Sequence, residues 1–467
     1  MKKLKDCLEL FLLFFKIGLF TFGGGYAMIS LISHEVVEKK KYIDGEEFSD
    51  LVAIAESTPG PIAINSATYI GYKKAGVLGA VAASIGVVLP SLIIIYLISL
   101  FLGKILEYPL VQKAFKGIQC GVSVLILSAG LKLMKNVKKD VLSYVLLSLS
   151  LAFLLVINFT DWNISTIYFI IVGAIVGLIA YYRPKKNLDN GLIGEDLPEK
   201  SNENAKRNQP EKADDGAIIQ KNCDAEKPEE KKKGKLKYIV SFSVVGVIIL
   251  CLLFFGGLYK FVFEDAVKNL STSAFYVNFL TVSELYATFF KIGLFSFGGG
   301  YGMLPLMLEE TVGRNWLTSA EFANFLAVAE STPGPVSINM ATYVGSTQGG
   351  LLGSVMATLG VITPSIIVIL IIVALLKDFL QYQGVRAALT GMKPVICGMI
   401  IATALDLALT NVFPAIESFS IEGFSAAAVF ITAVIALVSV AYKKFKKKAV
   451  SPIILIIISA ALGLILT

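Results

Sequence analysis

The sequence predicts an all-α integral membrane protein made of two repeats with inverted topology. Three observations carry this prediction: the apolar composition, motifs that occur twice, and the placement of lysine in the loops. Of the 467 residues, 55% are hydrophobic and only 16% are charged, and the mean hydropathy is +0.72. A soluble protein of this length cannot bury so much apolar surface, so the chain is expected to lie in the lipid bilayer.

Motifs that occur once in each half of the chain identify a tandem duplication. The pairs are FFKIGLFTFGGGY (14–26) with FFKIGLFSFGGGY (289–301), AIAESTPGPIAINSATYIG (53–71) with AVAESTPGPVSINMATYVG (327–345), and SIGVVLPS (84–91) with TLGVITPS (358–365). The first pair differs only at Thr21 and Ser296, and the second pair is identical at 14 of 19 positions.

Each half contains about six apolar elements, most of them long enough to cross ~30 Å of hydrocarbon as a helix. They lie near 8–31, 48–72, 77–103, 114–134, 141–159 and 164–182 in the first half, and near 281–305, 322–346, 350–376, 386–408, 423–442 and 449–467 in the second. The stretch 183–237 is rich in Lys, Glu, Asp, Asn and Pro and is expected to be a disordered linker. The predicted organisation is a first repeat (1–182), this linker, a linking helix (238–260) and a second repeat (261–467).

Lysine changes place between the two halves. The loop after the fourth element is KNVKKD (135–140) in the first half, whereas its counterpart in the second half has no Lys or Arg. After the fifth element the pattern reverses, with FTDWN in the first half and KKFKKK (443–448) in the second. Because basic loops stay in the cytoplasm, we expect inverted repeats with about thirteen spans, the N-terminus and linker inside and the C-terminus outside. The alternative is that the second element is a re-entrant hairpin, which on this count would place the N-terminus outside.

Composition and motif content argue against several functions. The net charge of +7 comes from lysines at the ends of apolar spans, so no nucleic-acid partner is expected. The five cysteines form no CxxC and the chain has a single histidine, His34, so no metal, cofactor or disulfide framework is expected. No GxxxxGK[ST] motif occurs, so the energy for any transport would come from a gradient.

Both duplicated motifs break an apolar element. Adjacent glycines cost about 1 kcal/mol each in a helix, and Pro-Gly-Pro removes backbone donors. Irregular backbone at membrane depth is tolerated only where it is buried in protein or lines a cavity. Inverted repeats with interrupted helices are typical of secondary transporters, whose substrate lies between the repeats. The breaks are Gly23, Gly24, Gly25 and Pro59-Gly60-Pro61 in the first half, and Gly298, Gly299, Gly300 and Pro333-Gly334-Pro335 in the second.

The chemistry around the Pro-Gly-Pro breaks favours an anion. A half-helix that starts there presents free N–H groups, such as those of Gly60, Ile62 and Ala63, and the positive end of its dipole. Hydroxyl and amide donors stand beside each break, and one lysine lies in each first element. The predicted substrate-binding set therefore joins the glycines of the two triplets to Lys16, Ser57, Thr58, Gly60 and Asn65, and to Lys291, Ser331, Thr332, Gly334 and Asn339.

Glu56 and Glu330 directly precede the Ser-Thr pairs at the two breaks. A carboxyl group buried beside an anion is more stable when protonated, so both are candidates for carrying a coupling proton.

Each of these sequence features also has a purely structural interpretation. The glycines can serve close helix packing, the lysines can extend to the interface, Pro-Gly-Pro can be a kink, and the carboxylates can cap a helix end or pair with a lysine.

At these residues the chain resembles the chromate ion transporter family. The resemblance covers both halves, through KIGLFTFGGGYAM with AESTPGPIAIN and KIGLFSFGGGYGM with AESTPGPVSIN. It implies the long, two-half form of that family, a bacterial inner-membrane carrier that expels chromate, an anion similar to sulfate, by means of the proton motive force. Members associated with chromate resistance carry Gln-Leu before Pro-Gly-Pro and Ser-Gln after it. Here these places read Glu56-Ser57-Thr58 and Ile64-Asn65, with Ile338-Asn339 in the copy, so the resemblance implies the fold and the carrier role rather than one substrate.

The predicted function is thus secondary active transport of a small inorganic oxyanion, chromate or sulfate-like, by an ion-gradient-coupled exporter that is not an enzyme. The alternatives are a carrier of a different small solute, a passive channel, or a membrane-embedded enzyme acting on lipid, which would need a nucleophile–base pair or a metal cluster. The expected partners are the anion and the lipid bilayer. The sequence leaves the oligomeric state open, a homo-oligomer included.

Overall fold

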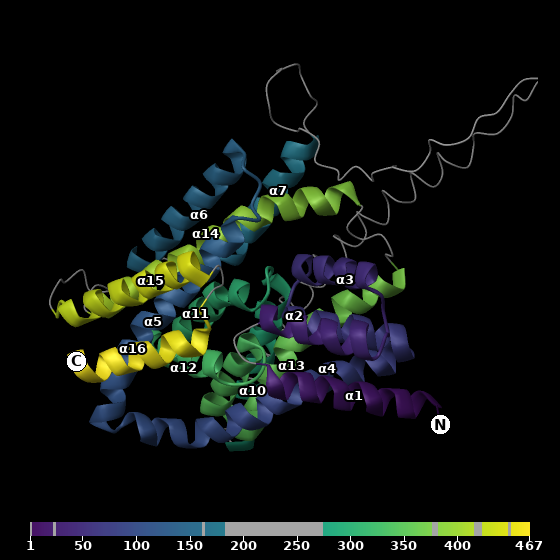
Figure 1. Ribbon diagram of the computed structural model, residues 1–467, viewed down its shortest axis with the longest axis horizontal. Coiled ribbons are helices and arrows are strands. Elements are labelled where there is room, and N and C mark those ends of the chain that lie inside the picture. Colours follow the sequence, from purple (N-terminus) through teal and green to yellow (C-terminus); the bar gives the residue numbers. More distant parts are fainter. Residues whose placement is uncertain are drawn as a thin grey trace, which may run out of the picture. The chain divides into compact units, whose positions relative to one another are not determined.

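The computed structural model describes residues 2–21, 25–160, 164–182, 274–375, 382–414, 423–446 and 450–467, and every regular element in these ranges is helical (Figure 1). The predicted linker and linking helix lie outside the described residues. The first half comprises α1 (Lys2–Phe20), α2 (Gly25–Ser33), the π-helical segment η1 (His34–Lys39), α3 (Gly45–Ser57), α4 (Ile62–Leu106), α5 (Pro109–Met134), α6 (Val141–Thr160) and α7 (Ile167–Tyr182). The second comprises α10 (Ala274–Phe295), the 3-10 turn η3 (Gly300–Met303), α11 (Leu304–Gly313), α12 (Ser319–Ser331), α13 (Val336–Leu375), α14 (Gln383–Val412), α15 (Ala426–Lys446) and α16 (Pro452–Leu466).

The longest helices, α4 and α13, each consist of two limbs that fold back on each other. The chain reverses at Gly76, where φ is +70°, and at Gly350, where φ is +59°. Thr68 and Ser84 lie on either side of the reversal at Gly76, and their hydroxyls hydrogen-bond at 2.8 Å across the two limbs. The limbs are therefore antiparallel, and only the second limb of each helix, 77–106 or 351–375, is long enough to cross a bilayer.

The second apolar element of each half is a re-entrant hairpin with Pro-Gly-Pro at its tip. In the first half, the Tyr69 hydroxyl donates to the Glu47 carboxylate at 3.2 Å, and Asn65 Nδ2 donates to the Ala55 carbonyl at 3.2 Å. These contacts place α3 and the limb 62–74 side by side and antiparallel. We call this unit the first PGP hairpin. The second PGP hairpin, α12 with 336–348, repeats the arrangement, since the Phe325 and Tyr343 rings stack with centroids 3.6 Å apart. The structure thus decides a point that the sequence had left open.

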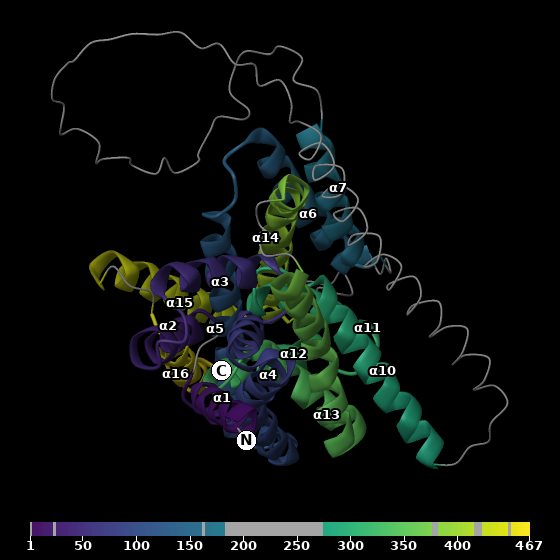
Figure 2. The same cartoon turned by 90° about the vertical axis from the view of Figure 1, so that its right-hand side faces the viewer.

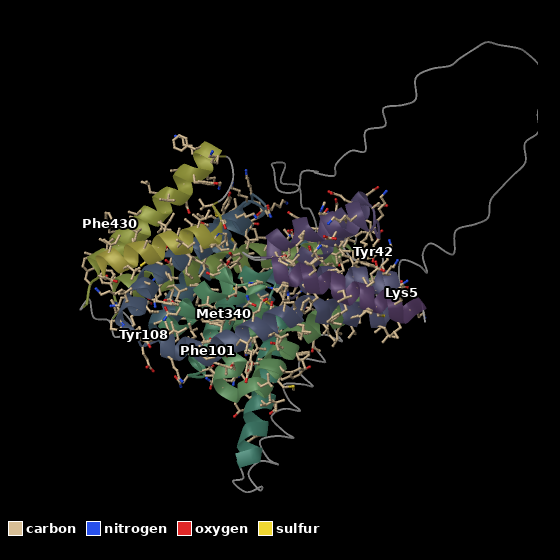
Figure 3. The ribbon with its side chains drawn as sticks, turned by 60° about the horizontal axis from the view of Figure 1, so that its bottom comes forward. Lys5, Tyr42, Phe101, Tyr108, Met340 and Phe430 are labelled. Carbon is tan, nitrogen blue, oxygen red and sulfur yellow. The ribbon has the colours of Figure 1, made fainter. Side chains whose placement is uncertain are left out.

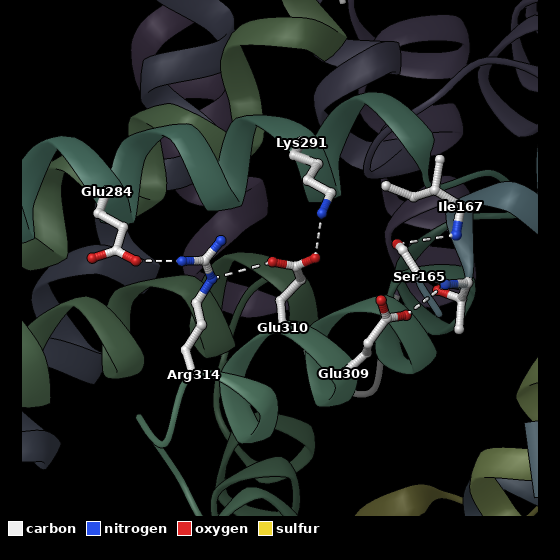
Figure 4. Close-up of polar contacts among 8 residues, drawn as sticks. Ser165, Ile167, Glu284, Lys291, Glu309, Glu310 and Arg314 are labelled. Atoms are coloured by element: carbon white, nitrogen blue, oxygen red, sulfur yellow. Dashed lines mark hydrogen bonds and ion pairs between the residues drawn. The ribbon is translucent and has the colours of Figure 1, made fainter. Parts of the chain in front are cut away.

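The first apolar element of each half is also a hairpin, and in the second half the described glycine triplet lies at its tip. Lys16 Nζ lies 3.2 Å from Glu35 Oε1 and joins α1 to η1. The corresponding contact, between Lys291 and Glu310 at 2.5 Å, joins α10 to α11 (Figure 4). We call these units the first and second GGG hairpins.

The sequence predicted that 8–31 and 281–305 each cross the membrane once, and the structure corrects this prediction. The chain can reverse at the triplet because glycine adopts positive φ, +85° at Gly298 and +80° at Gly299. Two hairpins return the chain to the side of the membrane from which it started, and so do two full spans. Every later loop therefore keeps the side that was expected for it. The positions expected for the basic loops therefore do not depend on this correction.

The remaining helices carry apolar side chains on their outer surface, as lipid-facing helices do. Phe101 and Phe430 are 59% and 56% exposed, whereas Met340 is 1% exposed and lies among the helices (Figure 3). Among the described residues, five helices are long and apolar enough to cross a membrane, and three shorter apolar helices (Val141–Ile157, Ile167–Tyr182 and Pro452–Leu466) accompany them. The chain is therefore a multi-pass membrane protein.

Glycines join the later helices of the two halves. α14 packs beside α6 and α7 (Figure 2), and the close approach of Gly173 to Gly391 brings α7 and α14 together backbone to backbone. The two helices are antiparallel, because the Tyr181 hydroxyl near the end of α7 contacts Gln383 at the start of α14. α5 and α16 form the corresponding antiparallel pair, in which the Thr467 hydroxyl donates to the Lys113 carbonyl at 3.3 Å.

We predict that the ion pair of the second GGG hairpin stabilises the fold through its two limbs. Lys291→Met leaves Glu310, whose side chain is 8% exposed, with one cation fewer, and should cost about 1–3 kcal/mol. Replacing Glu310 by Met as well should recover most of the loss, because Arg314 keeps its contact with Glu284. The measurement is the thermal unfolding midpoint in detergent, with Lys443→Met as the control at an exposed helix end. A double variant no more stable than Lys291→Met would contradict the prediction.

Candidate functional site

The tips of all four hairpins meet, and each half completes the backbone hydrogen bonds of the other. The Gly60 N–H at the first PGP tip donates to the Ser296 carbonyl of the second half at 2.9 Å. The Gly334 N–H at the second PGP tip donates to the Thr21 carbonyl of the first half, also at 2.9 Å. The contact is reciprocal, because the equivalent N–H of each half donates to the equivalent carbonyl of the other.

A serine from the opposite half packs against each PGP tip and explains why a glycine stands there. A Cβ atom at Gly60 would lie 1.7 Å from Ser365 Oγ, and one at Gly334 would lie 1.7 Å from Ser91 Oγ. Both glycines also have positive φ, +99° and +104°. Any side chain here would therefore strain the backbone and collide with the other half.

A small cavity of about 10 Å³ lies between the tips. Its walls come from both PGP segments and from the second GGG hairpin: Pro61, Ile62, Ala63, Gly300, Tyr301, Pro335 and Val336. The limbs that begin at Ile62 and Val336 point their first turns at it, where backbone N–H groups have no carbonyl partner in their own helix. The cavity therefore lies at the positive ends of two helix dipoles and has room for about one water molecule.

Buried polar atoms without a hydrogen-bond partner gather around the tips. Among the described residues, they include Asn65 Oδ1, Ser66 Oγ, both carboxyl oxygens of Glu330, Ser337 Oγ, Asn339 Oδ1 and Ser365 Oγ. An unpaired buried polar group costs about 1–3 kcal/mol. These atoms therefore have hydrogen-bonding capacity for ordered water or for a ligand.

Several of the predicted donors are engaged within their own hairpins. Thr58 and Thr332 donate to the Ile54 and Val328 carbonyls, each at 2.9 Å, and Ser331 donates to the Ala327 carbonyl at 2.7 Å. Asn65 Nδ2 and Asn339 Nδ2 each contact three oxygens of their own hairpin, which are those of Ala55, Thr58 and Pro59 and those of Ala329, Thr332 and Pro333. Ser57 is partly buried at the end of α3. These side chains shape the tips, and the uncommitted donors are the first-turn N–H groups and the hydroxyls of Ser66, Ser337 and Ser365.

The predicted lysines lie on the GGG hairpins and do not line the cavity. Each is part of a duplicated cluster in which one carboxylate joins two cations. Glu35 joins Lys16 to Lys39, which it contacts at 2.9 Å, and Glu310 joins Lys291 to Arg314 at 3.2 Å (Figure 4). The sequence analysis missed the carboxylates of these clusters, although Glu35 and Glu310 occupy equivalent positions after the two triplets.

The glycine triplets are placed unequally. Gly23 and Gly24 lie outside the described residues, and Gly25 begins α2. In the second half, a Cβ at Gly299 would lie 2.7 Å from Ile62 Cδ1, and Gly300 lines the cavity. The second triplet therefore contacts the first PGP hairpin directly.

The structure adds residues that the sequence did not single out. Ser91 and Ser365 end the third duplicated motif, so their recurrence in both halves could have identified them from the sequence. Tyr301 ends the second FGGGY and lines the cavity. Ser337 has no polar counterpart, since Ala63 stands in its place in the first half, and no repeat signal could have found it.

The chain is similar to known transporters over most of its length. The family model described as "Chromate transporter" matches residues 8–178 and 283–464. An uncharacterized transporter of Methanocaldococcus jannaschii is 26% identical over 406 residues, covering 86% of this chain and 85% of that protein. Chromate transport proteins of Pseudomonas aeruginosa and Cupriavidus metallidurans are 26% and 22% identical, each over 86% of this chain, and are themselves covered over 80% and 83%. The search of solved structures gave no match.

We predict that Gly334→Ala destabilises the protein through its collision with Ser91. The positive φ alone should cost about 1–2 kcal/mol, and the overlap adds to it. Ser91→Gly removes the overlapping atoms and should restore the part of the loss that is not backbone strain. Gly350→Ala, at a positive φ with open space around it, is the control for strain alone. Thermal unfolding midpoints measure the effects, and equal losses for Gly334→Ala and Gly350→Ala would show that the two halves do not interlock here.

Proposed function

The chain belongs to the chromate transporter family, and from this premise we propose that it is a secondary active transporter of a small tetrahedral oxyanion of the chromate or sulfate kind. The single observation that carries the proposal is the cavity at which two helix N-termini, one from each half, face each other. Backbone N–H groups at helix N-termini bind oxyanions without any cationic side chain. The relatives named as chromate transport proteins support the same ligand class.

We further propose that the halves are inverted repeats and work by alternating access. The antiparallel packing of α7 on α14, and of α5 on α16, supports this. In the chain, α6 alone stands between α5 and α7, so α5 and α7 would run in the same direction. α14 is antiparallel to α7 and would therefore be antiparallel to α5, which is its counterpart in the other repeat. The hairpin tips would then enter the bilayer from opposite sides and meet near its middle, where such carriers bind substrate.

The cavity has room for about one water molecule, so the tips would have to move apart to admit the anion, which would then be held by the N–H groups of Ile62, Ala63, Val336 and Ser337 together with the Ser337 hydroxyl. The predicted residues at the tips, from Ser57 to Asn65 and from Ser331 to Asn339, would position these donors. Lys16 and Lys291, which lie outside the cavity lining, would add a positive electrostatic potential at the cavity. Their carboxylate partners, Glu35 and Glu310, would reduce that potential. A site built mainly from backbone dipoles binds an anion without the strong hold of an unpaired cation.

Transport would be coupled to an ion gradient and directed outward across the inner membrane. An interior-negative potential acts on each negative charge moved with about 2.3 kcal/mol per 100 mV, which favours export of an anion. The N-terminus and the linker would be cytoplasmic and the C-terminus external. The loop 135–140 and the end of α15, with Lys443 and Lys444, would both be cytoplasmic, as their charge requires.

The proposal predicts saturable flux of radiolabelled sulfate or chromate in proteoliposomes that contain the purified full chain. Unlabelled chromate should compete with sulfate, and a pH gradient or membrane potential should change the rate. Protein-free vesicles and the Gly334→Ala variant are the controls. An absence of saturable flux for both oxyanions would retire the substrate class, and unitary conductance that does not respond to pH would indicate a channel.

The proposed topology predicts that cysteines placed at Lys138 and Lys444 react with an impermeant maleimide only from the cytoplasmic side. A cysteine at Glu107, in the loop between α4 and α5, should react only from the outside. The labelling is done in intact cells and inverted vesicles, on a background in which the native cysteines are replaced. Reaction of Lys138→Cys and Lys444→Cys from opposite sides would show that the repeats are not inverted.

A further inference from the structure

Two carboxyl groups that occupy equivalent places in the repeats have different surroundings. Glu56 and Glu330 stand in the same local sequence, Ala-Glu-Ser-Thr-Pro-Gly-Pro. Glu330 is 1% exposed, whereas Glu56 is only partly buried. The difference comes from packing. α12 lies against α5 and α16, and its Asn324 accepts a 2.7 Å hydrogen bond from Gln119 of α5, whereas α3 packs mainly on α4.

Among the residues that the structure describes, the buried Glu330 has no counter-ion. Neither of its carboxyl oxygens has a hydrogen bond of good geometry within the described residues. The titratable side chain that acts on it is Tyr301, whose hydroxyl faces it from the second GGG hairpin. The described charged groups nearest in the chain on a helix packed against α12 are Glu309 and Glu310 of α11. Glu310 is paired with Lys291 and Arg314, and Glu309 accepts a hydrogen bond from the Thr166 N–H, while the contact of α5 with α12, between Gln119 and Asn324, is uncharged. A carboxylate in such a place would be strongly destabilised, which favours the protonated acid.

Tyr301 connects this buried acid to the cavity. Its side chain lies among the residues that line the cavity, beside the two PGP segments, while its hydroxyl faces Glu330. A phenol can accept a proton on its oxygen and donate its own, so it can relay a proton without a net change of charge. The route from Glu330 to the cavity therefore needs one intermediate group.

We propose that Glu330 and Tyr301 form the proton-binding pair of the transport site, so that one proton on Glu330 travels in the same direction as the anion. This inference rests on the proposed function. Glu330 is neutral while the anion occupies the cavity, because an ionised carboxylate nearby would repel it. When the anion has left, Glu330 gives its proton to the Tyr301 oxygen as Tyr301 gives its own to water in the cavity. Glu330 ends as a carboxylate, Tyr301 is unchanged, and the proton leaves with the water.

Coupling of this sign is compatible with export. A divalent oxyanion that moves with one proton still carries one negative charge, so an interior-negative potential drives the pair outward. By reciprocity, a proton that favours anion binding must itself bind more tightly when the anion is present. Anion affinity should therefore rise as the pH falls.

Proton movement and anion movement can be measured separately in proteoliposomes loaded with a pH-sensitive dye. Inward flow of radiolabelled sulfate, which takes up no proton near neutral pH, should acidify the interior of wild-type vesicles. For each variant, acidification is expressed per sulfate ion moved, so that any change in sulfate flow itself is divided out. Glu330→Gln should lose acidification per sulfate and the rise of affinity at low pH, and Tyr301→Phe should lower acidification per sulfate by about 10-fold or more. Glu56→Gln is the matched control in the other repeat and should acidify as the wild type does.

Two results would overturn the inference while leaving oxyanion transport in place: wild-type sulfate flow without acidification, or unchanged acidification in Glu330→Gln. An infrared difference spectrum of the purified protein on a pH jump tests the pair without any substrate. The carbonyl band of a protonated carboxyl group should be present in the wild type and in Glu56→Gln, displaced in Tyr301→Phe and absent in Glu330→Gln. If neither sulfate nor chromate flux is found, the proposed function fails. The carbonyl band then tests by itself whether Glu330 and Tyr301 form a proton-binding pair.

Discussion

An interrupted helix inside a bilayer persists only if its free backbone groups find partners within the protein, and here each half provides partners for the other. The Gly60 N–H binds the carbonyl of Ser296, and the Gly334 N–H binds that of Thr21. Neither tip is complete without the opposite repeat. This exchange also explains why the duplicated motifs have changed so little relative to each other. A substitution at a tip disturbs two halves at once, because Ser91 and Ser365 lie where a side chain would have to go.

The same exchange brings the positive ends of two helices to one small space while the cations remain elsewhere. Lys16 and Lys291 are held by Glu35 and Glu310, and the described residues that line the cavity carry no formal positive charge. For a carrier this arrangement has a physical advantage. Oriented N–H groups can replace part of the hydration shell of an anion, but they do not hold it as an unpaired buried cation would. A transport site has to release its ligand, so moderate affinity built from backbone dipoles suits the task.

The sequence supported the larger features of this arrangement and missed those that depend on tertiary contacts. The duplication, the breaks at the glycine triplets and at Pro-Gly-Pro, and the convergence of the tips follow from recurring residues and from the cost of irregular backbone in lipid. The reversal of the first element does not, because two short apolar limbs joined by glycines have the hydropathy of one continuous span. The partners of Lys16 and Lys291 lie 19 residues further along the chain, beyond the local spacing at which helix pairs can be recognised. The lysines alone therefore suggested a direct role at the site.

The contrast between Glu56 and Glu330 could not have been predicted at all, because their local sequences are the same. It arises from α5 and α16, which cover the second PGP hairpin, and it means that the two halves do not occupy equivalent positions in this structure. Under the proposed inversion of the repeats, the nearly identical contact residues would admit a second arrangement in which the roles are exchanged, with α3 covered by α14 and α7 and with α12 uncovered. The two arrangements would differ in energy only through the residues that differ between the halves. Such near-equivalence is what alternating access requires, since a carrier has to populate both states for its substrate to enter on one side and leave on the other. Under the proposed alternating access, the buried carboxyl group would mark the closed side of the site, and its exposure would mark the other state.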